Sequence, residues 1–287
     1  MNCEPIIASM MESVTEAHIA PDDYINPTDG LRYCGKCHTP KEKYFDEQHR
    51  FSGFTKHPVR CKCEAEEKER RDEEMRDFNR RNHIQLLRSE AFADIPAAAW
   101  RFDNPDILSY GLNASQKIVQ RYAQKWDEAK AQNLGLCLFG NVGTGKSYAA
   151  GCVANALIDR QISVLFVRVT TVVTQLQGLF NKDREQYIKT LMHSDLLILD
   201  DLGAERSTSF GKECVFDVVD RRVLSGKPMI ITTNTPLHAL KNATETEDRR
   251  IYDRLLTVCA PVEFKGENHR KARAADTTRV AATLLSQ

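Results

Sequence analysis

A glycine-rich stretch near the middle of the chain carries the residue types that bind phosphate. It follows the apolar run Leu134–Phe139 and precedes a segment with helical composition, Tyr148–Arg160. Glycines at this spacing let backbone N–H groups converge on phosphate oxygens, and the positive end of the next helix faces the same anion. A strand, such a loop and a helix in this order predict a P-loop. Its residues are Gly140, Asn141, Val142, Gly143, Thr144, Gly145, Lys146, Ser147 and Tyr148.

This loop predicts a site for a nucleoside triphosphate. In a P-loop, the Lys146 ammonium neutralises the β- and γ-phosphates, and the Ser147 hydroxyl holds Mg²⁺. The alternative is a glycine turn without a ligand, which the flanking strand and helix make less favoured. We therefore expect ATP and Mg²⁺ at this loop.

Paired carboxylates and an amide follow two later apolar runs. Leu196–Leu199 leads into Asp200 and Asp201, and Pro228–Thr233 leads into Asn234. Continuous apolar runs are typical of parallel strands, whose carboxyl ends meet where ligands bind. We expect Asp200 to hold Mg²⁺ and Asp201 to deprotonate the attacking water, with Asn234 positioning that water. The alternatives are an aspartate that caps a helix and an asparagine that opens a turn.

Two close pairs of cysteines near the N-terminus have the spacing of a metal site. They are Cys34 with Cys37 and Cys61 with Cys63. Four thiolates suit a tetrahedral zinc ion, and four protein ligands leave no open position, so we expect a structural role. The second pair is one residue shorter than the usual spacing, so His38 and His57 are alternatives for one ligand. Reduced surface thiols and a redox pair are the other interpretations.

Composition limits the compartment and the partners. The chain has 287 residues, 41% of them hydrophobic, which is enough for one large domain and an appendage. Its zero net charge excludes a uniformly basic coat for nucleic acid. No apolar run approaches the roughly 18 residues of a bilayer span. Nine cysteines without a secretory signal fit a reducing compartment, so we expect a cytoplasmic protein.

Changes in composition divide the chain into three parts. Residues 1–63 hold the cysteine pairs, residues 64–90 form a highly charged stretch of helix formers, and residues 91–287 hold the P-loop. Opposite charges four residues apart favour a solvated linker helix in the middle part, and a partner-docking arm is the alternative. Further elements are expected in the third part: strands at 163–169 and 261–264, and helices at 170–180, 184–193 and 247–256.

The order of these motifs resembles the AAA+ ATPases, and specifically the DnaC/DnaI-type helicase loaders of bacteria and their phages. The resemblance covers about residues 90–266, and the cysteine module with its charged helix resembles the N-terminal region of many loaders. The resemblance implies residue roles: Lys146 and Ser147 in Walker A, Asp200 and Asp201 in Walker B, and Asn234 as sensor 1. It also implies an arginine finger, Arg254 ahead of Arg250. Arginines in ordinary surface ion pairs are the alternative.

The implied fold is an α/β AAA+ P-loop core with a parallel sheet, preceded by a zinc-binding module and a charged helix. No helical lid is expected, because only 21 residues follow Gly266. The implied function is ATP-dependent loading of a DnaB-type replicative hexameric helicase onto single-stranded DNA, with self-association on the helicase. The implied cofactors are ATP, Mg²⁺ and Zn²⁺.

Two details of the resemblance give further expectations. Asp201 stands where many AAA+ proteins have glutamate, so we expect slow hydrolysis. The resemblance places single-stranded DNA near Thr170–Phe180, where an ordinary amphipathic helix is the alternative.

Other functions compete with helicase loading. A transposition helper of the IstB type has a very similar core but acts on duplex DNA and a transposase, and the cysteine module argues mildly against it. A P-loop kinase needs an acceptor-substrate domain and a lid with arginines, and neither is evident between the predicted strands.

Overall fold

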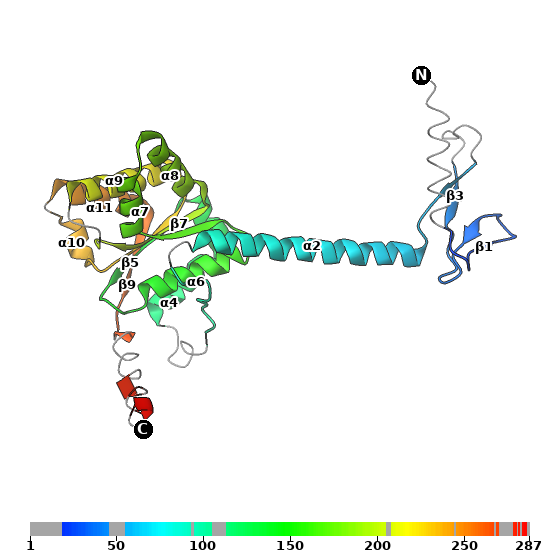
Figure 1. Ribbon diagram of the computed structural model, residues 1–287, viewed down its shortest axis with the longest axis horizontal. Coiled ribbons are helices and arrows are strands. Elements are labelled where there is room, and N and C mark those ends of the chain that lie inside the picture. The colour runs from blue at the N-terminus through cyan, green and yellow to red at the C-terminus, as the bar shows by residue number, and fades with distance from the viewer. Residues whose placement is uncertain are drawn as a thin grey trace, which may run out of the picture. The chain divides into compact units, whose positions relative to one another are not determined.

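The structure of the protein, a computed structural model, describes residues 19–45, 55–92, 95–104, 113–204, 208–243, 245–266 and 268–269, with short stretches at 278–279, 281 and 283–285. The chain forms two compact units, Met1–Arg80 and Arg81–Gln287 (Figure 1).

The described part of the first unit contains two short antiparallel ribbons. In one, β1 (Tyr24–Ile25) pairs with β2 (Arg32–Tyr33), and in the other β3 (Glu42–Tyr44) pairs with β4 (Lys56–Pro58). The first cysteine pair follows β2 and the second follows β4. Each ribbon therefore delivers two of the four thiols.

A buried ion cluster joins the two ribbons to the helix that follows them. The Lys41 side chain is only 4% exposed, and its ammonium lies 2.9 Å from Asp23 Oδ2 and 2.8 Å from Glu64 Oε1. Burial lowers the pKa of Lys41, but the hydrogen bonds that its ammonium donates to Glu64 and Asp23 outweigh this effect and raise that pKa above its usual value. The cluster stays charged, because each charge has its partner.

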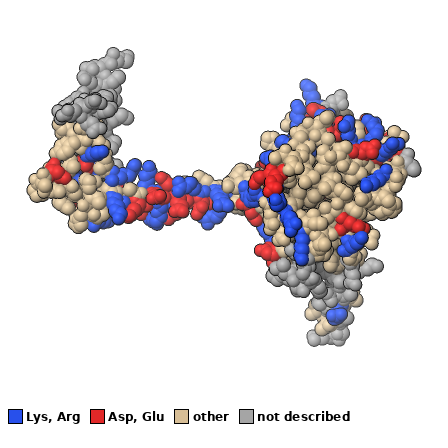
Figure 2. All heavy atoms as spheres, turned by 180° about the vertical axis from the view of Figure 1, so that it is seen from behind, with Lys and Arg blue, Asp and Glu red and all other residues tan. Residues whose placement is uncertain are grey.

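Helix α2 (Lys62–Ala91) contains the charged stretch that was predicted to be helical. Exposed ion pairs run along it, such as Arg71 Nε with Glu67 Oε1 at 2.9 Å, and Figure 2 shows basic and acidic side chains interspersed over its surface. Pairs of this kind stabilise a helix by only a few tenths of a kcal/mol each. The helix therefore relies on helix-forming residues along most of its length.

A five-stranded parallel sheet forms the centre of the second unit. Its strand order is β6-β7-β8-β5-β9, and all four neighbouring pairs are parallel. The strands are β5 (Gly135–Gly140), β6 (Val164–Arg168), β7 (Leu196–Leu202), β8 (Met229–Thr233) and β9 (Cys259–Phe264). Nearly every residue of β5, β7 and β8 is buried, as expected for strands covered on both faces.

Helices cover both faces of this sheet (Figure 1). The end of α2, α4 (Ala114–Gln124), α5 (Trp126–Ala131) and α6 (Lys146–Ile158) contribute to one apolar core. The opposite core takes side chains from α7 (Val169–Gly178), α8 (Asn181–His193), α9 (Ser209–Leu224), α10 (Leu237–Lys241) and α11 (Thr246–Val258). The prediction of an α/β core with a parallel sheet is confirmed.

The segment that leads into the second unit is fastened to α6. The buried Asn155 amide donates hydrogen bonds to the carbonyls of Ala97, at 2.8 Å, and Trp100, at 3.0 Å. The Trp100 ring lies so close to α6 that a Cβ on Gly151 would be 2.4 Å from it. The same ring lies 5.3 Å from the Tyr148 ring. The first turns of α6 are thus packed against residues 95–104.

The predicted elements agree with the structure to within a few residues at their ends. The helix after the P-loop begins at Lys146 instead of Tyr148, and the last strand begins at Cys259 instead of Pro261. No prediction was made for β1–β4, α4, α5, α9 or α10. The expected lack of a lid concerns residues after Gly266, most of which lie outside the described residues.

Candidate functional site

The loop between β5 and α6 has the backbone that a P-loop requires. Gly143 and Gly145 have φ angles of 82° and 92°, in the left-handed region where a side chain is disfavoured. Gly145 caps α6, so the first helical residue is Lys146. The buried Thr144 hydroxyl donates to Asn141 O at 2.9 Å and fastens the loop to itself. The N–H groups at the start of α6 thus face the loop, as an anion site needs.

The Lys146 ammonium joins this loop to β8. It donates hydrogen bonds to Gly140 O at 2.8 Å, to Asn141 O at 2.7 Å and to Asn234 Oδ1 at 2.9 Å. Lys146 is 6% exposed, so its charge is held close to the loop. Strands β5 and β8 are neighbours in the sheet, which is why the two motifs meet although 88 residues separate them.

The two predicted carboxylates lie at the end of β7, beside Asn234. The Asn234 Nδ2 amide donates to Asp201 Oδ1 at 2.9 Å. Asp200 is buried, and its Oδ1 accepts a hydrogen bond from the Thr232 hydroxyl at 2.6 Å. The structure therefore brings Lys146, Asn234 and both aspartates into one connected cluster at the carboxyl edge of the sheet.

Sequence reasoning missed Thr232. A threonine inside an apolar strand is an ordinary strand former, and its spacing to the aspartates carries no motif. The one usable signal is its position two residues before Asn234, on a strand predicted to end at the same edge as the aspartates.

The residues in this cluster fit a magnesium nucleotide. Asp200 keeps a second carboxylate oxygen beyond the one bonded to Thr232, and Ser147 adds a hydroxyl in the first turn of α6. Carboxylate and hydroxyl oxygens are the ligands that Mg²⁺ prefers. Among the described residues, no heavy atom other than those of its chain neighbours lies within 4 Å of where a Cβ of Gly145 would be, whereas the Asn268 side chain lies against Gly143.

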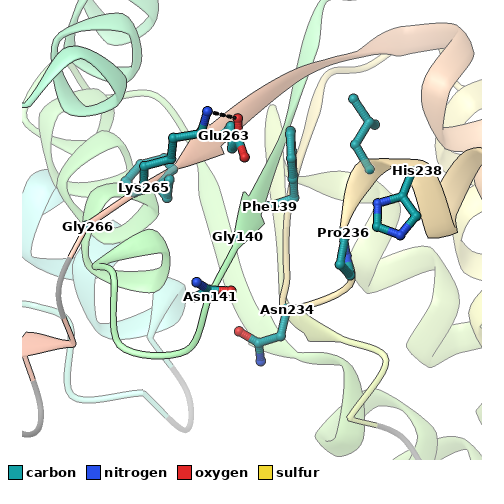
Figure 3. Close-up of a pocket in the computed structure, with 11 residues that line it drawn as sticks. Phe139, Gly140, Asn141, Asn234, Pro236, His238, Glu263, Lys265 and Gly266 are labelled. Carbon is teal, nitrogen blue, oxygen red and sulfur yellow. Dashed lines mark ion pairs between the residues drawn. The ribbon is translucent and has the colours of Figure 1, made fainter.

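A cleft of about 340 Å³ adjoins the P-loop at the same edge of the sheet (Figure 3). Its lining includes Asn141, which follows β5, and Asn234, which follows β8. Glu263 of β9 also lines the cleft, and its Oε2 lies 3.0 Å from the Nζ of Lys265, which follows that strand. The cleft thus continues the nucleotide cluster with polar groups of both signs.

The two candidate finger arginines contact α9 instead of the P-loop cluster. Arg254 Nε lies 2.9 Å from Asp220 Oδ1, and the Arg250 guanidinium lies 4.2 Å from the centre of the Phe216 ring. The Arg254 side chain is 51% exposed. The Asp220 side chain is 22% exposed, so the pair is only partly exposed, and the guanidinium is the accessible partner that a second molecule could contact.

The segment expected near DNA is an amphipathic helix with a projecting ring after it. Val169, Val172 and Leu176 of α7 are buried, while Arg168 is exposed. Phe180 is 86% exposed, although an isolated phenylalanine is usually part of a core. The surface therefore offers a cation and an aromatic ring beside α7.

The four N-terminal cysteines form one cluster. Their Sγ atoms all lie within 4.8 Å of one another, with Cys61 Sγ 3.3 Å and Cys34 Sγ 3.6 Å from Cys63 Sγ. A tetrahedral zinc ion with Zn–S bonds of about 2.3 Å needs sulfurs about 3.8 Å apart, so the cluster fits zinc. A hydrogen bond with Thr39 lowers the pKa of Cys37 to about 5, whereas burial raises the pKa of Cys61 in the same cluster.

The two histidines considered as ligands have other contacts. His38 Nδ1 lies 3.3 Å from the Tyr24 hydroxyl, and the His57 ring lies 4.9 Å from the Phe45 ring. Neither belongs to the group of metal-binding side chains found among the described residues, which consists of the four cysteines. The geometry thus favours four sulfur ligands.

In the part of the chain that the structure describes, no helix combines the length and the apolar character that a membrane crossing demands.

The chain is similar to proteins of bacterial replication. It is 27% identical to "Replicative helicase loader DnaI" of Bacillus subtilis over 59% of this chain and 58% of that protein. It is 29% identical to "Replicative helicase loader DnaC" of Escherichia coli over 54% of this chain and 62% of that protein. The matches thus span about three fifths of these curated relatives.

A solved structure and a family model agree with the described fold. A putative primosome component from Streptococcus pyogenes superposes with a TM-score of 0.50 at 21% identity, covering 61% of this chain and 92% of that one. The family model described as IstB-like ATP binding protein matches residues 67–277, well over half of the chain. The P-loop, the acid pair and the parallel sheet all lie within that match, and the chain belongs to the family of IstB-like ATP-binding proteins.

Proposed function

We propose that this protein hydrolyses ATP and uses it to load a DnaB-type replicative helicase onto single-stranded DNA. The observation that carries the proposal is the bonded cluster of Lys146, Asn234 and Asp201 beside Asp200. It joins the predicted phosphate loop to the two carboxylates that we assign as general base and magnesium ligand, within one edge of the sheet. The names of the relatives DnaI and DnaC support helicase loading as the use of that chemistry.

Each member of the cluster has a role in hydrolysis. Lys146 and the N–H groups of residues 140–148 bind the phosphates, and Ser147 and Asp200 hold Mg²⁺. When bound, Mg²⁺ neutralises negative charge on the phosphates. Asp201 accepts the proton of the attacking water. Asn234 already bonds to both Lys146 and Asp201, so its amide can hold that water between them.

Assembly follows from an arginine supplied by a neighbouring copy. Arg254 is exposed on α11, with Arg250 one turn before it, and either guanidinium would stabilise charge on the phosphates of the adjacent subunit. ATP binding would then favour self-association on the helicase, and hydrolysis would favour release, because the terminal phosphate is the shared contact.

The remaining parts bind the partners. We assign residues 1–63, held by Zn²⁺ on the four cysteines, to the helicase, residues 64–90 to a linker, and residues 91–287 to the ATPase. The exposed Phe180 and Arg168 beside α7 offer a stacking ring and a cation, which suit single-stranded DNA.

A co-precipitation experiment tests the proposal. The full chain is mixed with the DnaB-type helicase of its host, with ATP, with ADP and without nucleotide. We expect an ATP-dependent complex that the Lys146→Ala variant does not form, because that variant lacks the charge that binds the phosphates. A complex that forms equally with ATP, with ADP and without nucleotide, or no complex at all, would contradict ATP-dependent helicase loading.

The family match favours a second candidate, a transposition helper of the IstB type that binds duplex DNA. The two functions differ in the nucleic acid that they use. We expect single-stranded DNA to stimulate phosphate release more than a duplex of the same sequence. Stimulation by the duplex alone would favour the transposition helper.

A further inference from the structure

Thr232 lies between the two aspartates of the nucleotide cluster. It is 1% exposed on β8. Its hydroxyl donates to Asp200 Oδ1 at 2.6 Å and accepts a hydrogen bond from the Asp201 backbone N–H at 2.9 Å. A hydroxyl has one proton, so this proton goes to the Asp200 carboxylate and a lone pair receives the Asp201 N–H.

The pairing of β7 with β8 explains why one hydroxyl reaches both aspartates. Leu199 is opposite Ile231 and Leu202 is opposite Thr233, so two residues of β7 face the single residue Thr232. This is a β-bulge, and it leaves the Asp201 N–H without a regular ladder partner. Asp201 has a φ of 62°, in the left-handed region. The Thr232 hydroxyl supplies the missing acceptor at that point.

We propose that Thr232 is a positioning residue that orients both carboxylates for the hydrolysis proposed above. By occupying Asp200 Oδ1, it fixes the rotamer of that side chain and leaves Oδ2 for Mg²⁺. By binding the Asp201 N–H, it stabilises the bulge that turns the Asp201 carboxylate toward Asn234, where the 2.9 Å hydrogen bond holds it. The inference rests on the proposed ATPase function and adds a residue that contacts neither substrate nor metal.

The neighbouring threonine provides a matched control. Thr233 is also fully buried on β8, and its hydroxyl donates to Leu202 O at 2.7 Å and accepts from Thr235 N at 3.1 Å. These hydrogen-bond partners are backbone groups outside the acid pair. Removing this hydroxyl therefore removes a comparable amount of buried hydrogen bonding without freeing either carboxylate.

The test compares Thr232→Val, Thr232→Ser and Thr233→Val. Calorimetry measures binding of a non-hydrolysable ATP analogue as Mg²⁺ is varied, phosphate release gives kcat, and thermal unfolding without nucleotide gives the melting temperature. For Thr232→Val we expect the Mg²⁺ concentration at half-maximal binding to rise about tenfold and kcat to fall about 10- to 100-fold. These factors correspond to the free energy of a hydrogen bond to a charged group. Thr232→Ser should stay within about twofold of the wild type, because it keeps the hydroxyl.

Thr233→Val should lower the melting temperature but leave the Mg²⁺ dependence unchanged. If Thr232→Val does not fold, Thr232→Ala removes the same hydroxyl, and the same shift is expected. The inference is overturned if a folded Thr232 variant without the hydroxyl keeps the Mg²⁺ dependence of the wild type. It is also overturned if Thr233→Val shifts the Mg²⁺ dependence equally. In both cases the ATPase proposal stands. A wild-type protein that binds no magnesium nucleotide overturns both.

Discussion

Replacing Asp201 by asparagine separates its chemical role from its structural one. The residue has a φ of 62°, a conformation that asparagine adopts about as readily as aspartate. The backbone N–H still bonds to Thr232, and an asparagine Oδ1 can still accept from Asn234 Nδ2. Only the negative charge and the proton-accepting capacity are lost. We therefore expect the free energy of unfolding to change by less than about 0.5 kcal/mol.

The effect on turnover should be much larger. A positioned general base accelerates proton transfer by about 10²- to 10⁴-fold, so we expect kcat to fall by that factor. This corresponds to about 3–5 kcal/mol in the activation barrier. The affinity for magnesium nucleotide should stay within about threefold, since the phosphate-binding charge belongs to Lys146.

The assay combines phosphate release at saturating ATP with calorimetric binding and thermal unfolding. Asp195→Asn is the control, because Asp195 precedes the opposite end of β7 and bonds to Lys130 and Ser163. That change should reduce stability without reducing kcat. If Asp201→Asn turns over within about threefold of the wild type while remaining folded, Asp201 is not the base.

Three further changes test the other parts of the proposal. Arg254→Ala should leave the nucleotide affinity of the single subunit unchanged. It should lower kcat about tenfold or more when the protein is concentrated or bound to helicase, because an arginine finger acts on the neighbouring subunit. Phosphate release as a function of protein concentration measures this effect. Cys34→Ser should remove bound zinc, measured by metal analysis, and leave the melting temperature of the ATPase unit unchanged. Lys41→Met leaves the 1%-exposed Asp23 carboxylate without its ammonium partner and should destabilise the zinc module by about 3–5 kcal/mol, measured as faster zinc transfer to a chelator.

Exposed residues nearby give controls for two of these changes. Arg249, also on α11, is 73% exposed and lies 3.9 Å from Asp253, so Arg249→Ala should leave kcat unchanged at every protein concentration. Lys62, at the start of α2, is 70% exposed and lies 3.9 Å from Glu66, so Lys62→Met should leave zinc transfer unchanged. If a control has the same effect as its partner variant, Arg254 is not the arginine finger, or Lys41 does not stabilise the zinc module.

The parts of the site that sequence predicts are those that a local pattern encodes. The strand, loop and helix around Lys146 follow from adjacent residues, and the apolar runs before Asp200 and Asn234 mark strands that end at one edge. The contact between Lys146 and Asn234 depends on strand order, which places β8 next to β5 and which spacing does not encode.

Other features escaped prediction because they depend on tertiary packing. Helix α9 mixes apolar and charged residues without a clear apolar stripe, so its sequence pattern matches neither an amphipathic helix nor a strand. The zinc ligands were ambiguous until the ribbons brought four sulfurs together and left His38 and His57 beside aromatic rings. Thr232 acquires its contacts only from the bulge in β7.

The stacking of Trp100 on the first turns of α6 gives the chain an internal optical probe. The protein has two tryptophans, and the other, Trp126, is the first residue of α5 and is 1% exposed. Trp100 instead lies half-buried against Tyr148, the residue next to Ser147. We therefore expect its emission to respond to a rearrangement at the start of α6 while that of Trp126 stays constant, so that nucleotide binding at the proposed phosphate loop can be tested by fluorescence without a label.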